Sequence, residues 1–185
     1  EKVARARDVV PDVAVRTTCI VGFPGETEDD FARLLDFLEE VRFERVGGFT
    51  YSAQEGTRAA QLPDDVPEAV KLDRLERLTE LQRAITADRY ERHLGRTVRV
   101  LVDRPGDELG EVQARTVWQA DDVDGITRVR GEAPPGAFAE VSLDEVVDDY
   151  DFAGRLLRVV EPAPAPRAGR ALPVVAGISN GSFGR

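Results

Sequence analysis

The stretch Arg16-Thr-Thr-Cys-Ile-Val-Gly-Phe-Pro-Gly-Glu-Thr-Glu-Asp-Asp-Phe31 decides the fold class of this chain. A β-branched, mostly apolar run from Val13 to Val21 is typical of a buried strand, and it ends in a turn rich in Gly and Pro. Thr27 is a good helix N-cap, and the three acidic residues after it favour the positive start of a helix. A strand, a tight turn and a helix in this order indicate a parallel α/β fold, in which ligands bind at such corners.

The residues on either side extend this pattern. Residues 2–10 predict a helix that Pro11 ends, and residues 46–52 predict a second short strand. One apolar stripe at helical spacing follows Thr27, formed by Phe31, Leu34, Leu35, Leu38 and Val41. The order helix, strand, helix, strand predicts a parallel sheet. Because two strands cannot make an independent α/β domain, and because the chain does not start with Met, we expect the remaining strands upstream in a longer protein.

A long charged helix is predicted from Pro67 to about Leu94, after a polar loop at residues 53–66. Pro67 suits the first helical position and Gly95 suits a C-terminal stop. The apolar face of this helix is expected to consist of Leu72, Leu75, Leu78, Leu81 and Ile85.

After Gly95 the hydrophobic period changes from that of a helix to that of strands. Five short alternating segments are separated by Gly, Asp and Pro, at residues 97–103, 111–117, 125–130, 137–143 and 152–159. This spacing predicts a small antiparallel barrel. Residues 161–185 hold few large apolar groups and predict a disordered tail. The predicted organisation is an α/β part at residues 1–66, a linking helix at 67–94, a β-barrel at 95–160 and the tail.

Composition restricts the possible partners. The 185 residues carry a formal net charge of −10, which disfavours nucleic-acid binding through phosphates and suits a basic protein partner. From residue 95 to residue 160 there are eight arginines, no lysine and 14 acidic residues, a net charge of −6. A single cysteine excludes an internal disulfide, and no run approaches the about 20 apolar residues of a membrane helix. We therefore expect a cytoplasmic protein without a membrane partner.

Several motifs in order resemble one enzyme family. They are residues 16–27, Phe49-Thr-Tyr-Ser52, Glu55-Gly-Thr57, Val123-Asp-Gly125 and Asp149-Tyr-Asp-Phe152. Together they resemble the C-terminal part of the radical S-adenosylmethionine methylthiotransferases, of the RimO type, which modify an aspartate of a small-subunit ribosomal protein. The resemblance implies the end of a partial TIM-like radical S-adenosylmethionine barrel, followed by a TRAM domain of OB-like shape. The acidic TRAM domain would then bind a basic ribosomal protein.

The resemblance also implies cofactors. Members of the family use S-adenosylmethionine and two 4Fe–4S clusters that cysteines hold. Cys19 is the only cysteine, so neither cluster can be ligated by this chain, and we expect the chain alone to be inactive. We accordingly assign no catalytic or metal-binding residue. The residues expected to form one wall of the S-adenosylmethionine pocket are Arg16, Val21, Gly22, Phe23, Gly25 and Glu26.

Several alternatives stay open at the level of sequence. A buried Arg16 could hold the cofactor carboxylate or pair with an internal acid, and Glu26 could contact the cofactor or only favour the helix start. Tyr51 could face the active centre or fill the core, and Trp118 could contact a partner or pack inside the small barrel. Cys19 is expected to behave as a small apolar residue. The alternative functions are a tRNA methylthiotransferase of the same superfamily and a non-catalytic protein-binding fragment.

Overall fold

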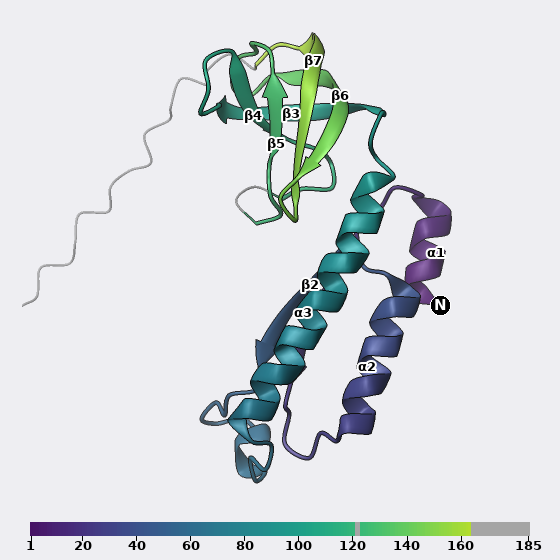
Figure 1. Ribbon diagram of the computed structural model, residues 1–185, viewed down its shortest axis with the longest axis vertical. Helices are drawn as coiled ribbons and strands as arrows, with labels where there is room; N and C mark the ends of the chain where they lie inside the picture. Colours follow the sequence, from purple (N-terminus) through teal and green to yellow (C-terminus); the bar gives the residue numbers. More distant parts are fainter. Residues whose placement is uncertain (121–122, 164–185) are drawn as a thin grey trace, which may run out of the picture.

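The computed structural model describes residues 1–120 and 123–163, and Figure 1 shows two units joined by one long helix. The first unit holds a small sheet with its helices, and the second is a β-barrel at the C-terminal end of the long helix. The elements of the first unit are α1 (Lys2–Val9), β1 (Arg16–Val21), α2 (Glu28–Val41), β2 (Arg45–Thr50), the 3₁₀ turn η1 (Ala59–Gln61) and α3 (Glu68–Glu91).

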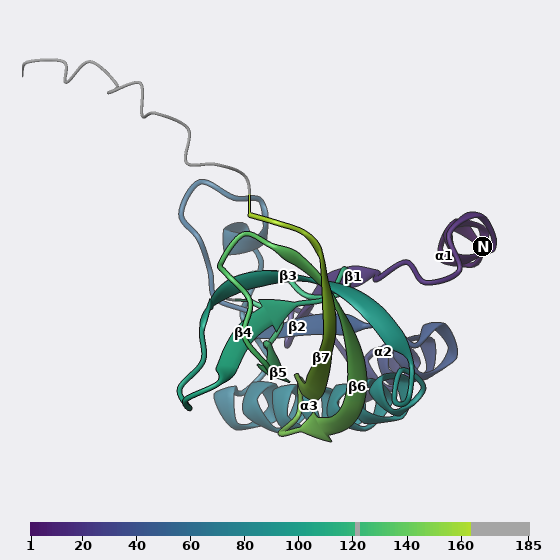
Figure 2. The same ribbon diagram turned by 90° about the horizontal axis from the view of Figure 1, so that it is seen from above.

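Strands β1 and β2 pair in parallel, with Arg16 opposite Arg45 and Val21 opposite Thr50, which confirms the predicted parallel pairing. The prediction of a buried strand is wrong for most of β1. Only Val21 is fully buried, and Ile20 is 55% exposed. The reason is that α2 and α3 cover one face of the sheet (Figure 2), so side chains that alternate to the other face stay exposed in the part that the structure describes.

The start of α2 follows its sequence signals. The Thr27 hydroxyl accepts a hydrogen bond from the Asp30 N–H, and the Asp30 carboxylate accepts one from the Thr27 N–H, which forms a capping box. Phe31 and Leu38 on the predicted stripe are completely buried against Val21 and Leu78. The helix therefore fixes the direction in which the chain leaves β1.

The predicted apolar face of α3 is partly wrong. Leu72 is 55% exposed, whereas the side chains of Lys71, Arg74 and Gln82 are buried. Each of these polar groups has a partner: Lys71 pairs with Asp64, Arg74 with Glu26, and the Gln82 amide donates to the Phe43 carbonyl. The buried face of α3 therefore depends on three neighbours: the β1–α2 turn, the start of β2 and the loop before α3. Long polar side chains are buried on this face because they find partners there. Pro67 is the N-cap, one residue before the helix begins.

The second unit is a closed five-stranded barrel with the strand order β3-β4-β5-β7-β6. Its strands are β3 (Thr97–Pro105), β4 (Glu111–Arg115), β5 (Thr127–Arg130), β6 (Phe138–Val147) and β7 (Asp151–Glu161). The prediction of an all-antiparallel barrel is wrong, because β5 and β7 pair in parallel. An odd number of strands cannot alternate in direction all the way round a closed barrel, so at least one neighbouring pair must be parallel.

The barrel core consists of alternating valines and small residues around Phe152. Tyr90 from the last turn of α3 stacks on the Phe152 ring, with 4.4 Å between the ring centroids, and thereby joins the barrel to the helix. Strand β7 continues to Glu161, into the predicted tail, and residues 164–185 of that tail lie outside the described residues. Across the described ranges, every helix is too short or too polar to cross a membrane. The partial TIM-like barrel stays a prediction.

Candidate functional site

The corner between β1 and α2 is a tightly held turn. Gly22 has φ +72°, and a Cβ atom there would lie 2.3 Å from Cγ of Lys71, so only glycine fits. The Gly22 N–H donates to Oε1 of Glu26 over 3.0 Å, and Nη1 of Arg74 donates to the same oxygen over 2.8 Å. The Arg74 side chain is 4% exposed. Glu26 therefore joins the turn to α3 through a buried ion pair, in addition to preceding the helix start.

A pocket of about 350 Å³ opens beside this corner, at the ends of both parallel strands. Its wall includes Phe23 from the turn and Tyr51 and Ser52, which directly follow β2. The rings of Phe23 and Tyr51 meet edge to face, with centroids 5.2 Å apart. The Tyr51 hydroxyl is buried and makes no hydrogen bond with any residue that the structure describes. The pocket thus has an aromatic wall, while the Tyr51 hydroxyl itself is buried from solvent.

The structure brings five of the six predicted cofactor-wall residues to this corner. Phe23 lines the pocket, and Val21 is buried directly before the turn. Gly25 and Glu26 line a neighbouring hollow of about 320 Å³, where the Gly25 N–H donates to the Asp65 carboxylate over 2.8 Å. The amides of both turn glycines are therefore already hydrogen-bonded within the chain.

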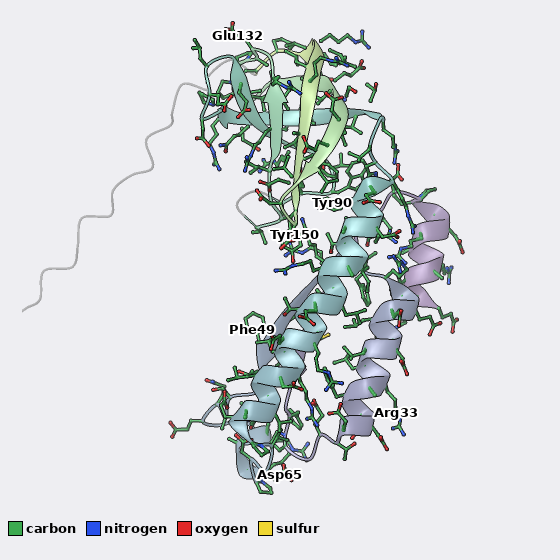
Figure 3. All side chains as sticks on the ribbon, in the orientation of Figure 1. Arg33, Phe49, Asp65, Tyr90, Glu132 and Tyr150 are labelled. Atoms are coloured by element: carbon green, nitrogen blue, oxygen red, sulfur yellow. The ribbon has the colours of Figure 1, made fainter. Side chains whose placement is uncertain are left out.

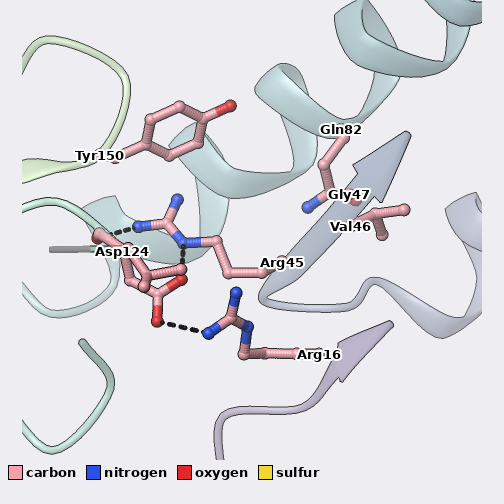
Figure 4. Close-up of a pocket in the computed structure, with 8 residues that line it drawn as sticks. Arg16, Arg45, Val46, Gly47, Gln82, Asp124 and Tyr150 are labelled. Carbon is pink, nitrogen blue, oxygen red and sulfur yellow. Dashed lines mark hydrogen bonds and ion pairs between the residues drawn. The ribbon is translucent and has the colours of Figure 1, made fainter. Parts of the chain in front are cut away.

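Arg16 lies elsewhere, at the opposite end of β1 and beside the barrel (Figure 4). Its Nη1 atom is 3.1 Å from Oδ2 of Asp124, and its side chain is 48% exposed. The prediction that Arg16 is buried is wrong, because it occupies the uncovered face at the start of β1. Of the two partners considered for it, an internal acid is the one that the structure provides.

Arg45 occupies the equivalent place at the start of β2 and joins the same acid. Its Nε atom lies 3.5 Å from Oδ1 of Asp124, and its Nη2 atom donates to the hydroxyl of Tyr90 over 2.6 Å. The Tyr150 ring lies against its guanidinium, 4.2 Å from the centroid to Cζ. Burial raises the pKa of Tyr90 to about 12, so its hydroxyl keeps its proton at neutral pH. We call Arg16, Arg45, Tyr90, Asp124 and Tyr150 the junction network.

Sequence reasoning missed Arg45, Tyr90 and Asp124. A usable signal was present, because an arginine stands near the start of each predicted parallel strand and strand starts lie side by side in a parallel sheet. The acid that pairs with both arginines is 108 residues from Arg16. In the sequence it is singled out only as part of the motif Val123-Asp-Gly125, which indicates no partner for it.

Trp118 contributes a second contact between the units. Its ring stacks on His93, 3.8 Å between centroids, and its indole N–H donates to the backbone carbonyl of Asp12 over 2.9 Å. It also packs on the barrel core, so core packing and contact with another segment both occur. Burial lowers the pKa of His93, and the neighbouring Arg96 guanidinium acts in the same direction.

The residues present do not fit an iron–sulfur cluster. No group of three His, Cys, Asp or Glu side chains within residues 1–120 and 123–163 is placed to hold a metal ion. Cys19 is half-buried beside the apolar core of the first unit, and burial raises the pKa of its thiol. A raised pKa disfavours the thiolate that ligates metals.

Comparison with known proteins identifies the second unit. Residues 94–157 match the family model of the TRAM domain. The barrel is a TRAM domain. In Figure 3, Tyr150 of this domain lies at one end of the first unit, and Asp65, which is next to the β1–α2 corner, lies at the other end. The corner and the TRAM domain are thus separated by the length of the two strands.

Similarity to known proteins also extends far beyond the TRAM domain. A protein named ribosomal protein uS12 methylthiotransferase RimO from Anaeromyxobacter sp. (strain K) is 44% identical over 173 residues, 89% of this chain and 37% of the relative. The protein of the same name from Microcystis aeruginosa is 41% identical over 84% of this chain and 35% of the relative. The one from Salmonella arizonae is 44% identical over 83% of this chain and 34% of the relative. The chain spans about a third of the length of these curated relatives. The predicted resemblance to RimO-type methylthiotransferases is confirmed.

Proposed function

We propose that this chain is part of a RimO-type methylthiotransferase that modifies an aspartate of ribosomal protein uS12. The observation that carries the proposal is the extent of the similarity. Identity of 44% covers 89% of the chain, so it includes residues of the unit with the β1–α2 corner as well as the TRAM domain. The chain would contribute a cofactor wall and a substrate-binding domain to the whole enzyme.

The pocket beside the corner supports S-adenosylmethionine as the ligand. Its aromatic wall at Phe23 and Tyr51 suits a flat base, because ligand pockets are lined mainly by apolar and aromatic side chains. In the complete enzyme, radical chemistry would come from S-adenosylmethionine and an iron–sulfur cluster held outside this chain. Within this chain, Val21, Gly22, Gly25 and Glu26 would hold the turn in shape, with Phe23 at the pocket. Arg16 is left out, because it pairs with Asp124 at the far end of β1.

The iron–sulfur clusters need thiolates from outside these 185 residues, because the chain has one cysteine. We therefore expect the 185-residue chain to bind ligands but to transfer no methylthio group. The enzyme is expected to work in the cytoplasm, where ribosomal proteins are made.

The charge of the TRAM domain favours a basic protein over tRNA as the substrate. Its net charge of −6 between residues 95 and 160 attracts a cationic ribosomal protein and repels phosphates. The names of the similar proteins point to the same class of substrate.

The test incubates the complete enzyme, reconstituted with iron and sulfide and supplied with S-adenosylmethionine and a one-electron reductant, with purified uS12 or with bulk tRNA in parallel reactions. We expect one aspartate of uS12 to exchange a hydrogen for a methylthio group, with the corresponding gain in mass, and tRNA to stay unmodified. Modification of tRNA alone would show that the chain belongs to the tRNA-modifying alternative. Tight binding of uS12 by the 185-residue chain, with no modification by the complete protein, would favour the non-catalytic fragment.

A further inference from the structure

The TRAM domain contacts the first unit through a buried carboxylate. Asp124 is 3% exposed, and its two oxygens face two guanidiniums: Oδ2 lies 3.1 Å from Nη1 of Arg16, and Oδ1 lies 3.5 Å from Nε of Arg45. Oδ2 also accepts the Ala120 N–H over 2.9 Å, which fixes the carboxylate within its own loop. The Asp124 backbone carbonyl accepts a further hydrogen bond from Nη2 of Arg45. One residue of the barrel thus contacts the starts of both strands of the sheet.

Those strand starts are directly connected to the corner. Arg16 and Arg45 are register partners in the first ladder position of β1 and β2, and Val21 and Thr50 are partners in the last. The hydrogen-bonded ladder between them is continuous, so the orientation fixed at one end is transmitted to the other. Asp124 therefore contacts the sheet at the end of the ladder opposite the β1–α2 corner.

The electrostatics make this contact sensitive to the charge of one group. Two guanidiniums side by side repel each other, and the Arg45 side chain is only 11% exposed. With a neutral residue at position 124, the buried cation of Arg45 would lose its counter-charge. Two other ion pairs between described residues join the units, Arg83 with Asp149 and Arg96 with Asp12, each at 2.8 Å. Their side chains are all substantially exposed, so both pairs contribute little.

We propose that Asp124 is a positioning residue, which holds the TRAM domain and the substrate protein bound to it at a fixed distance and orientation from the cofactor corner. The part of this proposal that concerns substrate rests on the proposed function. The part that concerns orientation stands on the junction network alone.

The first test measures the orientation in the 185-residue chain. Spin labels are placed on cysteines introduced at the exposed positions Asp36 in α2 and Glu132 in the TRAM domain, in a Cys19→Ala background. Pulsed electron paramagnetic resonance should give one narrow distance distribution. Asp124→Asn, which keeps an oxygen for the Ala120 N–H and removes the charge, should at least double its width. Asp149→Asn removes the same charge from the exposed pair and is the matched control, with no expected change.

An unchanged distribution in Asp124→Asn overturns the proposal. If circular dichroism shows that this variant does not fold, Arg16→Gln decides in its place, because Arg16 is half exposed and its loss leaves both cores intact. Broadening in Arg16→Gln supports the proposal, and a distribution as narrow as that of the parent chain refutes it.

The second test uses the complete enzyme with uS12 and measures S-adenosylmethionine consumed per methylthiolated protein formed. A substrate that is bound but misplaced is modified less often for each S-adenosylmethionine that is cleaved, so Asp124→Asn should raise this ratio about tenfold. A variant that is merely less stable lowers both amounts together and leaves the ratio unchanged. If the unaltered enzyme does not modify uS12, the proposed function fails, while the distance measurement still decides the role of Asp124.

Discussion

The ion pair beneath the β1–α2 corner yields a prediction of stability. In Glu26→Gln, the side-chain oxygen that accepts the Gly22 N–H is retained, but the negative charge that faces Arg74 is lost. Arg74 then keeps its positive charge in a site where its side chain is 4% exposed. We expect the first unit to be destabilised, because a buried cation without a full counter-charge is unfavourable.

The contacts that remain set the magnitude. Removing one partner of a buried ion pair costs about 3–5 kcal/mol. Arg74 keeps a hydrogen bond to the backbone carbonyl of Glu26 at 3.2 Å and an ion pair with the exposed Glu28 at 3.5 Å. These retained contacts recover about 1 to 2 kcal/mol. The expected loss in the free energy of unfolding is therefore about 2 kcal/mol.

Two optical probes follow a urea titration. The three α-helices of the described residues precede the TRAM domain, so helical circular dichroism reports the first unit. The fluorescence of Trp118, the single tryptophan, reports the TRAM domain together with its contact to Asp12. Glu28→Gln is the matched control, and it should stay within about 0.5 kcal/mol of the parent chain because Glu28 is exposed. A Glu26→Gln variant as stable as this control would refute the assignment of Glu26 to a buried pair.

Three further predictions concern other positions. Gly125→Ala should destabilise the TRAM domain by at least about 2 kcal/mol, because Gly125 has φ +79° and a Cβ there would lie 2.3 Å from the Tyr150 carbonyl oxygen. The measurement is the urea midpoint followed by Trp118 fluorescence, and an unchanged midpoint would contradict the turn geometry. Burial lowers the pKa of His93 below its ordinary value of 6.5, so the contribution of neutral His93 to stability is present above that pH and is lost as the pH falls below it. The melting temperature of the His93→Gln variant should therefore change less between about pH 7.5 and about pH 5.5 than that of the parent chain. An equal change in both proteins would argue against burial as the cause. Cys19 should react with a thiol reagent at neutral pH more slowly than in the urea-unfolded chain, because burial raises its pKa, and equal rates would show that the thiol is freely accessible.

The corner could be predicted from sequence because its signals are local. Thr27 and Asp30 are three residues apart and form the capping box that their types indicate. Gly22 sits where a strand must turn into a helix, and its positive φ follows from that requirement. The stripe that begins at Phe31 faces the core as its spacing indicates: Phe31 and Leu38 are buried, and its other members are partly buried against the same core.

The junction could not be predicted in the same way, because its partners are distant in sequence. Arg16 and Asp124 meet only when the barrel has folded and docked. On α3, Leu72 is exposed and Arg74 is buried, because burial there depends on which neighbour each position faces rather than on the polarity of the side chain. The parallel pairing of β5 with β7 is likewise a consequence of barrel closure, which no single strand encodes.

The separation of the two sites restricts how the proposed enzyme can work. Strand β1 has six residues, and at about 3.3 Å per residue it spans about 20 Å between the junction and the corner. A substrate protein held by the TRAM domain therefore cannot present its docking surface and its reacting residue at the same place. The TRAM domain would bind one part of the protein, and a separate segment would reach the corner. Binding by the TRAM domain raises the effective concentration of the reacting segment at the corner only if the geometry between the two sites is fixed. If the TRAM domain rotates, the bound protein no longer holds that segment at the corner. This requirement gives the buried charge of Asp124 a role that an exposed ion pair such as Arg83–Asp149 cannot fill.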